Sequence, residues 1–147
     1  MILVTGAAGL NGTAIVREFS RNGAAVRALI RARSKAVALA ELPCVEVVEG
    51  GMARPETLDR ALEGIDRALI ISSSDPQMVD VQCRFVDACK AAGVAHVVKF
   101  SGKESNIGFD AAKPNTRTSL RLVQSRRWCE LRAYRIPRIT GQYQSFD

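Results

Sequence analysis

Three glycines near the amino terminus have the spacing of a phosphate-binding turn. Gly6, Gly9 and Gly12 lie three residues apart, between an apolar segment and a stretch with helical periodicity. The first glycine can adopt the positive φ of a tight turn, the second leaves no Cβ between backbone and phosphate, and the third lets the helix pack closely on the strand. Amide groups at the start of that helix then point toward the phosphates. This context, more than the glycines alone, favours dinucleotide binding over an incidental glycine-rich turn.

Three cations follow the second predicted strand, where the adenosine ribose of such a ligand would lie. They are Arg31, Arg33 and Lys35, and no acid occurs between Glu18 and Glu41. An NAD-preferring site usually has Asp or Glu at this point to hold the ribose hydroxyls, and a carboxylate there would repel a 2′-phosphate. A guanidinium can bind that phosphate with two hydrogen bonds. The pattern favours NADP(H) over NAD(H), and the alternative is a solvated basic helix start.

The segments around these residues alternate between two periodicities. Short continuous apolar runs bounded by Gly, Ser or Pro predict strands that are buried on both faces. The predicted strands are Met1–Thr5, Ala25–Ile30, Val45–Glu49, Ala68–Ser72 and His96–Phe100. Right-handed crossovers through the intervening helices predict a doubly wound, parallel α/β sheet of the Rossmann type, with strand order 3-2-1-4-5.

Helical patterns lie between these strands. The first helix is predicted around Ile15 and Phe19, and the second over Ser34–Leu42. A third runs from Pro55 to Gly64, with proline near its start and glycine at its end. The fourth is predicted with Asp75 as N-cap and Pro76 at its first position, followed by an apolar face and stopped by Gly93.

The order and spacing of these blocks resemble the NmrA-like group of atypical short-chain dehydrogenases/reductases. The resemblance covers roughly residues 1–113 and rests on VTGAAGLNG, VRALIR, VEVVEG, RPETLDRALEG, a strand ending ISSSDPQ, and AGVAHVVKFSGKES. It implies an NAD(P)-binding Rossmann domain. Members of the family include quinone and other small-molecule reductases, and also redox-sensing regulators that bind the cofactor without turning it over.

The resemblance also implies a set of cofactor contacts. Ser72 and Ser73 end the fourth strand, at the edge that faces the cofactor, although they could equally cap the next helix. Lys99 and Ser101 end the fifth strand, near the expected place of the nicotinamide. The full set is Thr5, Gly6, Gly9, Leu10, Asn11, Gly12, Arg31, Lys35, Ser72, Ser73, Lys99 and Ser101. One departure is Gly50–Gly51, where the family commonly has Gly-Asp after the third strand; the change removes a carboxylate near the adenine.

The sequence shows no clear catalytic residue. Short-chain dehydrogenases generally use a tyrosine with a lysine four residues on, but Tyr134 is followed at that offset by Arg138, and Tyr143 by Asp147. Lys103 is a weak candidate for orienting or protonating a substrate, against a solvated loop lysine. Hydride transfer needs only the cofactor and a positioned acceptor. The sequence therefore predicts a reductase for a small carbonyl or quinone, with a cofactor-binding sensor or an inactive truncated remnant as the alternative.

The composition of the chain argues against a membrane protein and against a metal-binding protein. The chain has 147 residues, of which 47% are hydrophobic and 24% charged, and no apolar run approaches the roughly 18 residues that span a bilayer. No cysteine pair or histidine has metal-ligand spacing, which favours idle thiols in a reducing cytoplasm. The cysteines are Cys44, Cys83, Cys89 and Cys129. We therefore expect a cytoplasmic protein with neither a metal site nor a membrane anchor.

The net charge of +6 is concentrated near the carboxyl terminus. Residues 1–113 carry 14 Lys and Arg against 13 acids, whereas residues 114–147 carry seven Arg against Glu130 and Asp147. We interpret 1–113 as the dinucleotide-binding domain and 114–147 as a divergent basic tail, for instance the product of a frameshift. A genuine basic arm for nucleic acid or an acidic partner is the less favoured alternative, because the tail has no Lys and no Gly or aromatic residues interleaved at regular spacing. A sheet without later strands would leave an apolar edge, so we also expect homodimers or aggregation.

Overall fold

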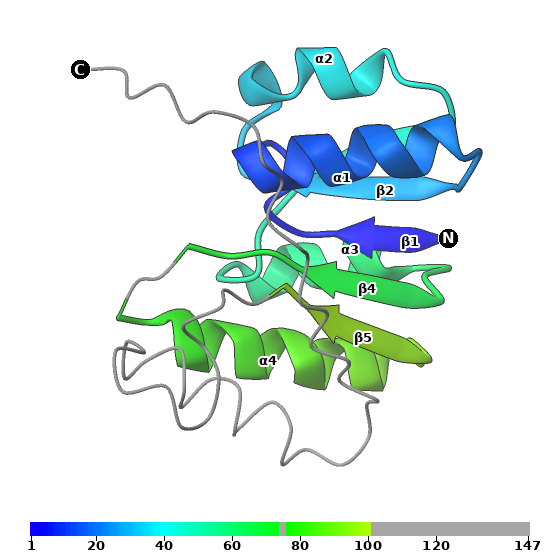
Figure 1. The fold of residues 1–147 in the computed structure, drawn as a ribbon. Helices are drawn as coiled ribbons and strands as arrows, with labels where there is room; N and C mark the ends of the chain where they lie inside the picture. Colours follow the sequence, from blue (N-terminus) through cyan, green and yellow to red (C-terminus); the bar gives the residue numbers. More distant parts are fainter. Residues whose placement is uncertain (74–75, 101–147) are drawn as a thin grey trace, which may run out of the picture.

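The computed structural model describes residues 1–73 and 76–100, and these form one parallel sheet with helices on both faces. Its strands are β1 (Ile2–Val4), β2 (Val26–Ile30), β3 (Val45–Glu49), β4 (Arg67–Ile70) and β5 (His96–Lys99). Strand order is β3-β2-β1-β4-β5 and every neighbouring pair is parallel, as predicted (Figure 1). The predicted boundary at residue 113, the tail 114–147, Ser101 and Lys103 lie outside the described residues.

Alternating side chains of each strand serve two separate cores. On one face, Leu3 and Leu29 pack with residues of α3 (Leu58–Leu62) and α4 (Met78–Ala91), among them the fully buried Phe85. On the other face, Val4 and Ile30 pack with residues of α1 (Leu10–Arg21) and α2 (Val37–Ala40). Burial on both faces explains why the strands appear in the sequence as continuous apolar runs rather than alternating ones.

Parallel strands bring all their carboxyl ends to one edge of the sheet. The crossover direction reverses at β1, because β2 and β3 follow on one side of it and β4 and β5 on the other. Ligands of open α/β sheets bind outside the carboxyl ends of the strands at such a reversal point. The glycine-rich segment between β1 and α1 lies there, as does the segment after β4.

Two predicted helices are shorter than the sequence indicated. The segment predicted as Ser34–Leu42 consists of a 3₁₀ turn over Arg33–Lys35 followed by the four-residue α2. Ala36, with φ −129°, interrupts the helical conformation between them. The predicted third helix begins as a 3₁₀ turn over Pro55–Thr57 and continues as the five-residue α3.

The fourth helix begins later than predicted. Its N-cap is Gln77 rather than Asp75, so the predicted cap is wrong. Pro76 and Gln77 form a turn before the helix, and the Val81 amide donates to the Gln77 carbonyl at 3.0 Å. The side chain of Gln77 forms no cap hydrogen bond at the helix start. The alternative role that the sequence left open for Ser72 and Ser73, capping this helix, stays a prediction.

Candidate functional site

Two of the three glycines are required by the packing around the turn. Gly6 has φ +60°, and a Cβ on it would lie 2.6 Å from the Ile71 carbonyl oxygen. A Cβ on Gly12 would lie 2.1 Å from the Gly6 carbonyl oxygen, so no side chain fits there. Gly9 is exposed, and its Cβ would meet only the Gly6 carbonyl oxygen, at 3.2 Å. The turn therefore presents bare backbone outward at Gly9, while Gly6 and Gly12 hold its shape.

Thr5 connects this turn to the end of β4. Its hydroxyl donates to the Ile71 carbonyl at 3.0 Å and accepts from the Ile71 amide at 2.9 Å. The residue is 1% exposed. Thr5 therefore fixes the two sides of the reversal point relative to each other, and its predicted contact with a cofactor remains a prediction.

The start of α1 can accept an anion. Gly9 is the N-cap and forms no side-chain cap hydrogen bond, and the first turn contains no acidic residue. Amides in the first turn of a helix have no intrahelical acceptor, and the helix dipole adds partial positive charge there. Leu10 is 77% exposed and Asn11 is also exposed, so their backbone is accessible from solvent. An incoming pyrophosphate would meet these amides at the carboxyl edge of the sheet.

The end of β2 carries exposed cations, as predicted, together with one that the sequence reasoning did not include. Arg31 and Arg33 are exposed, and Arg33 begins the 3₁₀ turn that ends at Lys35. Arg54, from the loop after β3, lies beside Arg31 and donates from Nη2 to the Arg31 carbonyl oxygen at 3.3 Å. Within residues 1–73 and 76–100, none of the three arginine side chains forms an ion pair. The sequence did contain a sign of Arg54, since it follows a predicted strand whose carboxyl end lies at the same edge of the sheet as the end of β2.

Ser72 is held by a residue that the sequence analysis did not single out. Gln82 of α4 is fully buried, and its side-chain amide donates to the Ser72 hydroxyl at 2.6 Å. A polar residue four positions after Met78 and three before Phe85, both on the buried face of the helix, was the available signal. Ser73 is exposed at the same edge. The pairing positions the Ser72 hydroxyl immediately after β4.

Lys99 ends β5 with a buried side chain. It is 3% exposed, and burial lowers the pKa of its amine from the ordinary value of 10.5. In the part of the chain that the structure describes, its amine forms neither a hydrogen bond nor an ion pair. Its predicted contact with a nicotinamide remains a prediction.

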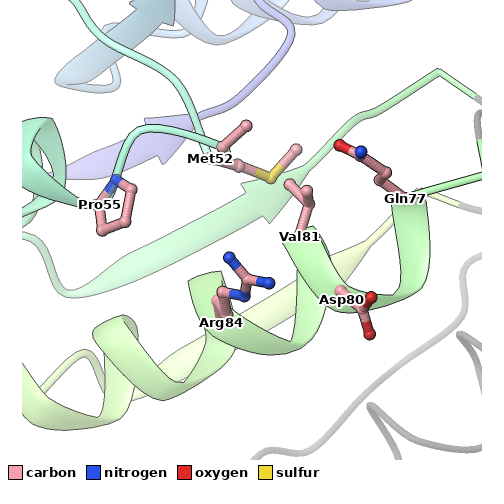
Figure 2. Close-up of a pocket in the computed structure, with 7 residues that line it drawn as sticks. Met52, Pro55, Gln77, Asp80, Val81 and Arg84 are labelled. Carbon is pink, nitrogen blue, oxygen red and sulfur yellow. The ribbon is translucent and has the colours of Figure 1, made fainter.

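A pocket of about 260 Å³ lies between the loop after β3 and the start of α4 (Figure 2). One wall is the loop after β3, with Met52, Ala53 and Pro55, and the other is the start of α4. Arg54 lies between two of these lining residues in the chain. Figure 2 shows Met52 and Val81 approaching each other across the pocket. The loop that carries Arg54 therefore also forms the wall of a cavity large enough for a nucleobase.

The family model for the NmrA-like family matches residues 1–115. The chain belongs to the NmrA-like family. This NmrA-like protein is 33% identical over 102 residues to an NAD(P)H azoreductase of Xenophilus azovorans, covering 69% of this chain and 35% of the relative. It is 40% identical over 101 residues to a (4-alkanoyl-5-oxo-2,5-dihydrofuran-3-yl)methyl phosphate reductase of Streptomyces griseus, covering 69% and 34%.

Solved structures agree with the architecture of the described residues. An NADPH-dependent quinone oxidoreductase of Escherichia coli in complex with NADPH is 28% identical to this NmrA-like protein, with a TM-score of 0.66. The match covers 84% of this chain and 45% of that protein. The chain spans about a third of the length of the curated relatives it matches.

The described residues contain neither a membrane-spanning helix nor a metal-binding cluster. None of the helices there is long and apolar enough to cross a membrane. The same residues contain no group of three or more His, Cys, Asp or Glu side chains that could hold a metal ion. Among the cysteines in this region, Cys44 is exposed while Cys83 and Cys89 are buried, and none of the three is part of a disulfide.

Proposed function

We propose that this NmrA-like protein binds NADP(H) in preference to NAD(H). We further propose that it acts as a cytoplasmic reductase whose acceptor is a quinone or small carbonyl compound. The observation that carries the preference is the end of β2, where Arg31 is exposed and unpaired among the described residues, beside a second arginine. A 2′-phosphate carries negative charge that such guanidinium groups bind strongly. NAD(H) offers only ribose hydroxyls at this point and would gain nothing comparable.

The residues present fit a dinucleotide on structural grounds. The turn after β1 excludes side chains at Gly6 and Gly12 and presents bare backbone at Gly9. The uncapped start of α1 supplies amides for the pyrophosphate. The bound dinucleotide would supply the hydride, while these residues bind and orient it.

The relatives support a reductase. The azoreductase and the quinone oxidoreductase are both named for reduction with a nicotinamide cofactor. Because the chain spans only part of their length, the acceptor is assigned here only by class. The alternative is a cofactor-binding sensor or an inactive remnant, which binds the dinucleotide without turnover. A quinone-dependent oxidation of NADPH, followed at 340 nm, separates the reductase from this alternative.

Substitution of Arg31 tests the cofactor preference. In Arg31→Ala, NADPH affinity should fall roughly ten- to a hundredfold, because a charge-assisted contact of about 1.5–3 kcal/mol is lost, while NADH affinity stays nearly unchanged. Arg31→Asp should lose more NADPH affinity through repulsion and gain NADH affinity through the ribose hydroxyls. Dissociation constants from nicotinamide fluorescence titration give both values.

A matched control is Arg67→Ala, an exposed arginine at the amino end of β4 and so at the opposite edge of the sheet. It should leave both affinities unchanged. Equal losses for NADPH and NADH in Arg31→Ala would show that Arg31 is structural, and the NADP(H) preference would then be wrong.

A further inference from the structure

The two adjacent glycines after β3, Gly50 and Gly51, differ in whether the surrounding packing requires a glycine. A Cβ on Gly50 would lie 2.8 Å from the Thr57 hydroxyl and 2.9 Å from Cδ1 of Leu29, so this residue must be glycine for packing. A Cβ on Gly51 would meet only Cγ of Arg31 and Nε of Arg54, both at 3.8 Å, which is ordinary contact distance. The backbone of Gly51 has no positive φ. Neither packing nor backbone conformation therefore requires glycine at residue 51.

Gly51 lies between the two arginines of the site. Its hypothetical Cβ is equidistant from atoms of Arg31 and Arg54, so any side chain at this position would enter the space that they flank. A carboxylate there would lie close to Nε of Arg54 and to the stem of Arg31, and would bring negative charge into this space. With glycine, the two positive charges remain available to an incoming anion, which is the arrangement that a phosphate needs.

The loop that carries Arg54 is held in place by a closed set of hydrogen bonds. The Arg54 amide donates to the Gly51 carbonyl at 2.8 Å, and the Thr57 hydroxyl donates to the Arg54 carbonyl at 2.7 Å. The same hydroxyl accepts from the Gly51 amide at 3.2 Å. Arg54 also reaches back to the Arg31 carbonyl oxygen. The backbone of Arg54 is therefore fixed relative to Arg31 before any ligand binds, which lowers the entropic cost of using both cations together.

We propose that Arg54 is a second specificity-determining residue for the cofactor 2′-phosphate, and that Gly51 keeps the space between Arg54 and Arg31 free of a competing side chain. The assignment rests on the NADP(H) preference proposed above. It places part of the cofactor specificity on the loop after β3, in addition to the end of β2.

Three variants of the full chain test this assignment. Gly51→Asp should lower the ratio of NADPH affinity to NADH affinity at least tenfold, because the carboxylate pairs with Arg54 and repels the 2′-phosphate, whereas any contact that it makes with the adenine is the same for both cofactors. Gly51→Ala is the matched control and should keep both affinities within about twofold, since its methyl group fits at ordinary contact distance. Arg54→Ala should weaken NADPH binding about five- to tenfold without changing NADH binding.

Fragments of the cofactor give a readout that does not depend on turnover or on the nicotinamide. Calorimetric titration with adenosine 2′,5′-bisphosphate should show the same losses in Gly51→Asp and Arg54→Ala, whereas titration with adenosine 5′-monophosphate should not. Thermal melting without ligand checks that each variant is folded. If Gly51→Asp fails to fold, Arg54→Ala alone decides the result.

The outcomes separate this inference from the proposed function. If Arg31→Ala loses NADPH selectively while Arg54→Ala and Gly51→Asp do not, the role of the loop is wrong and the cofactor preference stands. If the unmodified protein binds NADPH no more tightly than NADH, the preference and the inference resting on it both fall. Equal losses for both cofactors in Arg54→Ala would show a structural role and would overturn the inference.

Discussion

Strand β2 carries an arginine near each end, and the two are bonded in opposite ways. Near the amino end, Nε of Arg27 donates to Glu46 at 2.9 Å, and its Nη1 donates to the carbonyls of Ala61 and Glu63 at 3.1 and 2.6 Å. Arg31, just beyond the carboxyl end, is exposed, and its guanidinium has no hydrogen bond or ion pair within the described residues. The same residue type therefore serves the fold at one edge of the sheet and is available to a ligand at the other.

The difference follows from what lies at each edge. Helix α3 ends near the amino end of β2, and the last carbonyls of a helix lack intrahelical donors and carry partial negative charge. Arg27 satisfies them, and its side chain is only 12% exposed. At the carboxyl edge, the loop after β3 brings Gly51 and a further arginine, Arg54, beside Arg31. Bonding state, more than residue type, therefore distinguishes the structural arginine from the candidate binding arginine.

The largest effect should come from removing the structural arginine. Arg27→Ala should lower the free energy of unfolding by roughly 2–3 kcal/mol, because charged hydrogen bonds to Glu46 and the end of α3 are lost. The ratio of NADPH to NADH affinity should not change. Thermal denaturation and fluorescence titration measure the two effects. A stable Arg27→Ala variant with altered cofactor ratio would reverse the comparison.

An intermediate effect is expected at Lys99, the buried cation whose amine has no partner in the described part of the chain. Burial disfavours its charged form, so Lys99→Met should be more stable than the unmodified protein by about 1 kcal/mol, or roughly 2–4 °C in melting temperature. The effect depends on pH, because the pKa of the folded-state amine lies below its unfolded value of 10.5. Within that interval the unfolded chain binds more protons, so the stability of the unmodified protein rises with pH.

The advantage of Lys99→Met should therefore be full below the lowered pKa and disappear as the pH rises through 10.5. Melting curves at several pH values between 7 and 11 would measure it. A variant that is less stable than the unmodified protein at pH 7 would indicate that the Lys99 amine has a favourable partner.

The smallest effect should be the response to salt. Raising the ionic strength from about 0.02 to 0.5 M should weaken NADPH binding roughly three- to fivefold more than NADH binding, because exposed guanidinium groups are screened. The excess salt dependence should disappear in Arg31→Ala. Fluorescence titrations in a chloride series measure both slopes, and parallel slopes for the two cofactors would remove the charge-based account of the preference.

Strand positions and their order followed from the sequence, because burial on both faces produces continuous apolar runs that need no knowledge of the neighbours. The glycine turn was equally readable, since the positive φ of Gly6 and the close approach of Gly12 to the Gly6 carbonyl are local, although the contact of Gly6 with the Ile71 carbonyl is not. The short helices were less predictable. Neither Arg33–Lys35 nor Val37–Ala40 is long enough to be set by periodicity, and Ala36 gives no local sign of the break.

The sequence by itself determined the class of sheet, the location of the turn and the basic character of the segment after β2, because these depend on neighbours along the chain. Only the tertiary structure placed Arg54 beside Arg31, 23 residues away, and Gln82 against Ser72. It alone also showed that the Arg27 guanidinium donates hydrogen bonds to carbonyls at the end of α3, whereas the Arg31 guanidinium has no hydrogen-bond partner among the described residues. Which hydrogen-bond donors meet which acceptors depends on elements that come together across the sheet. The spacing of residues along the chain does not show which elements become neighbours.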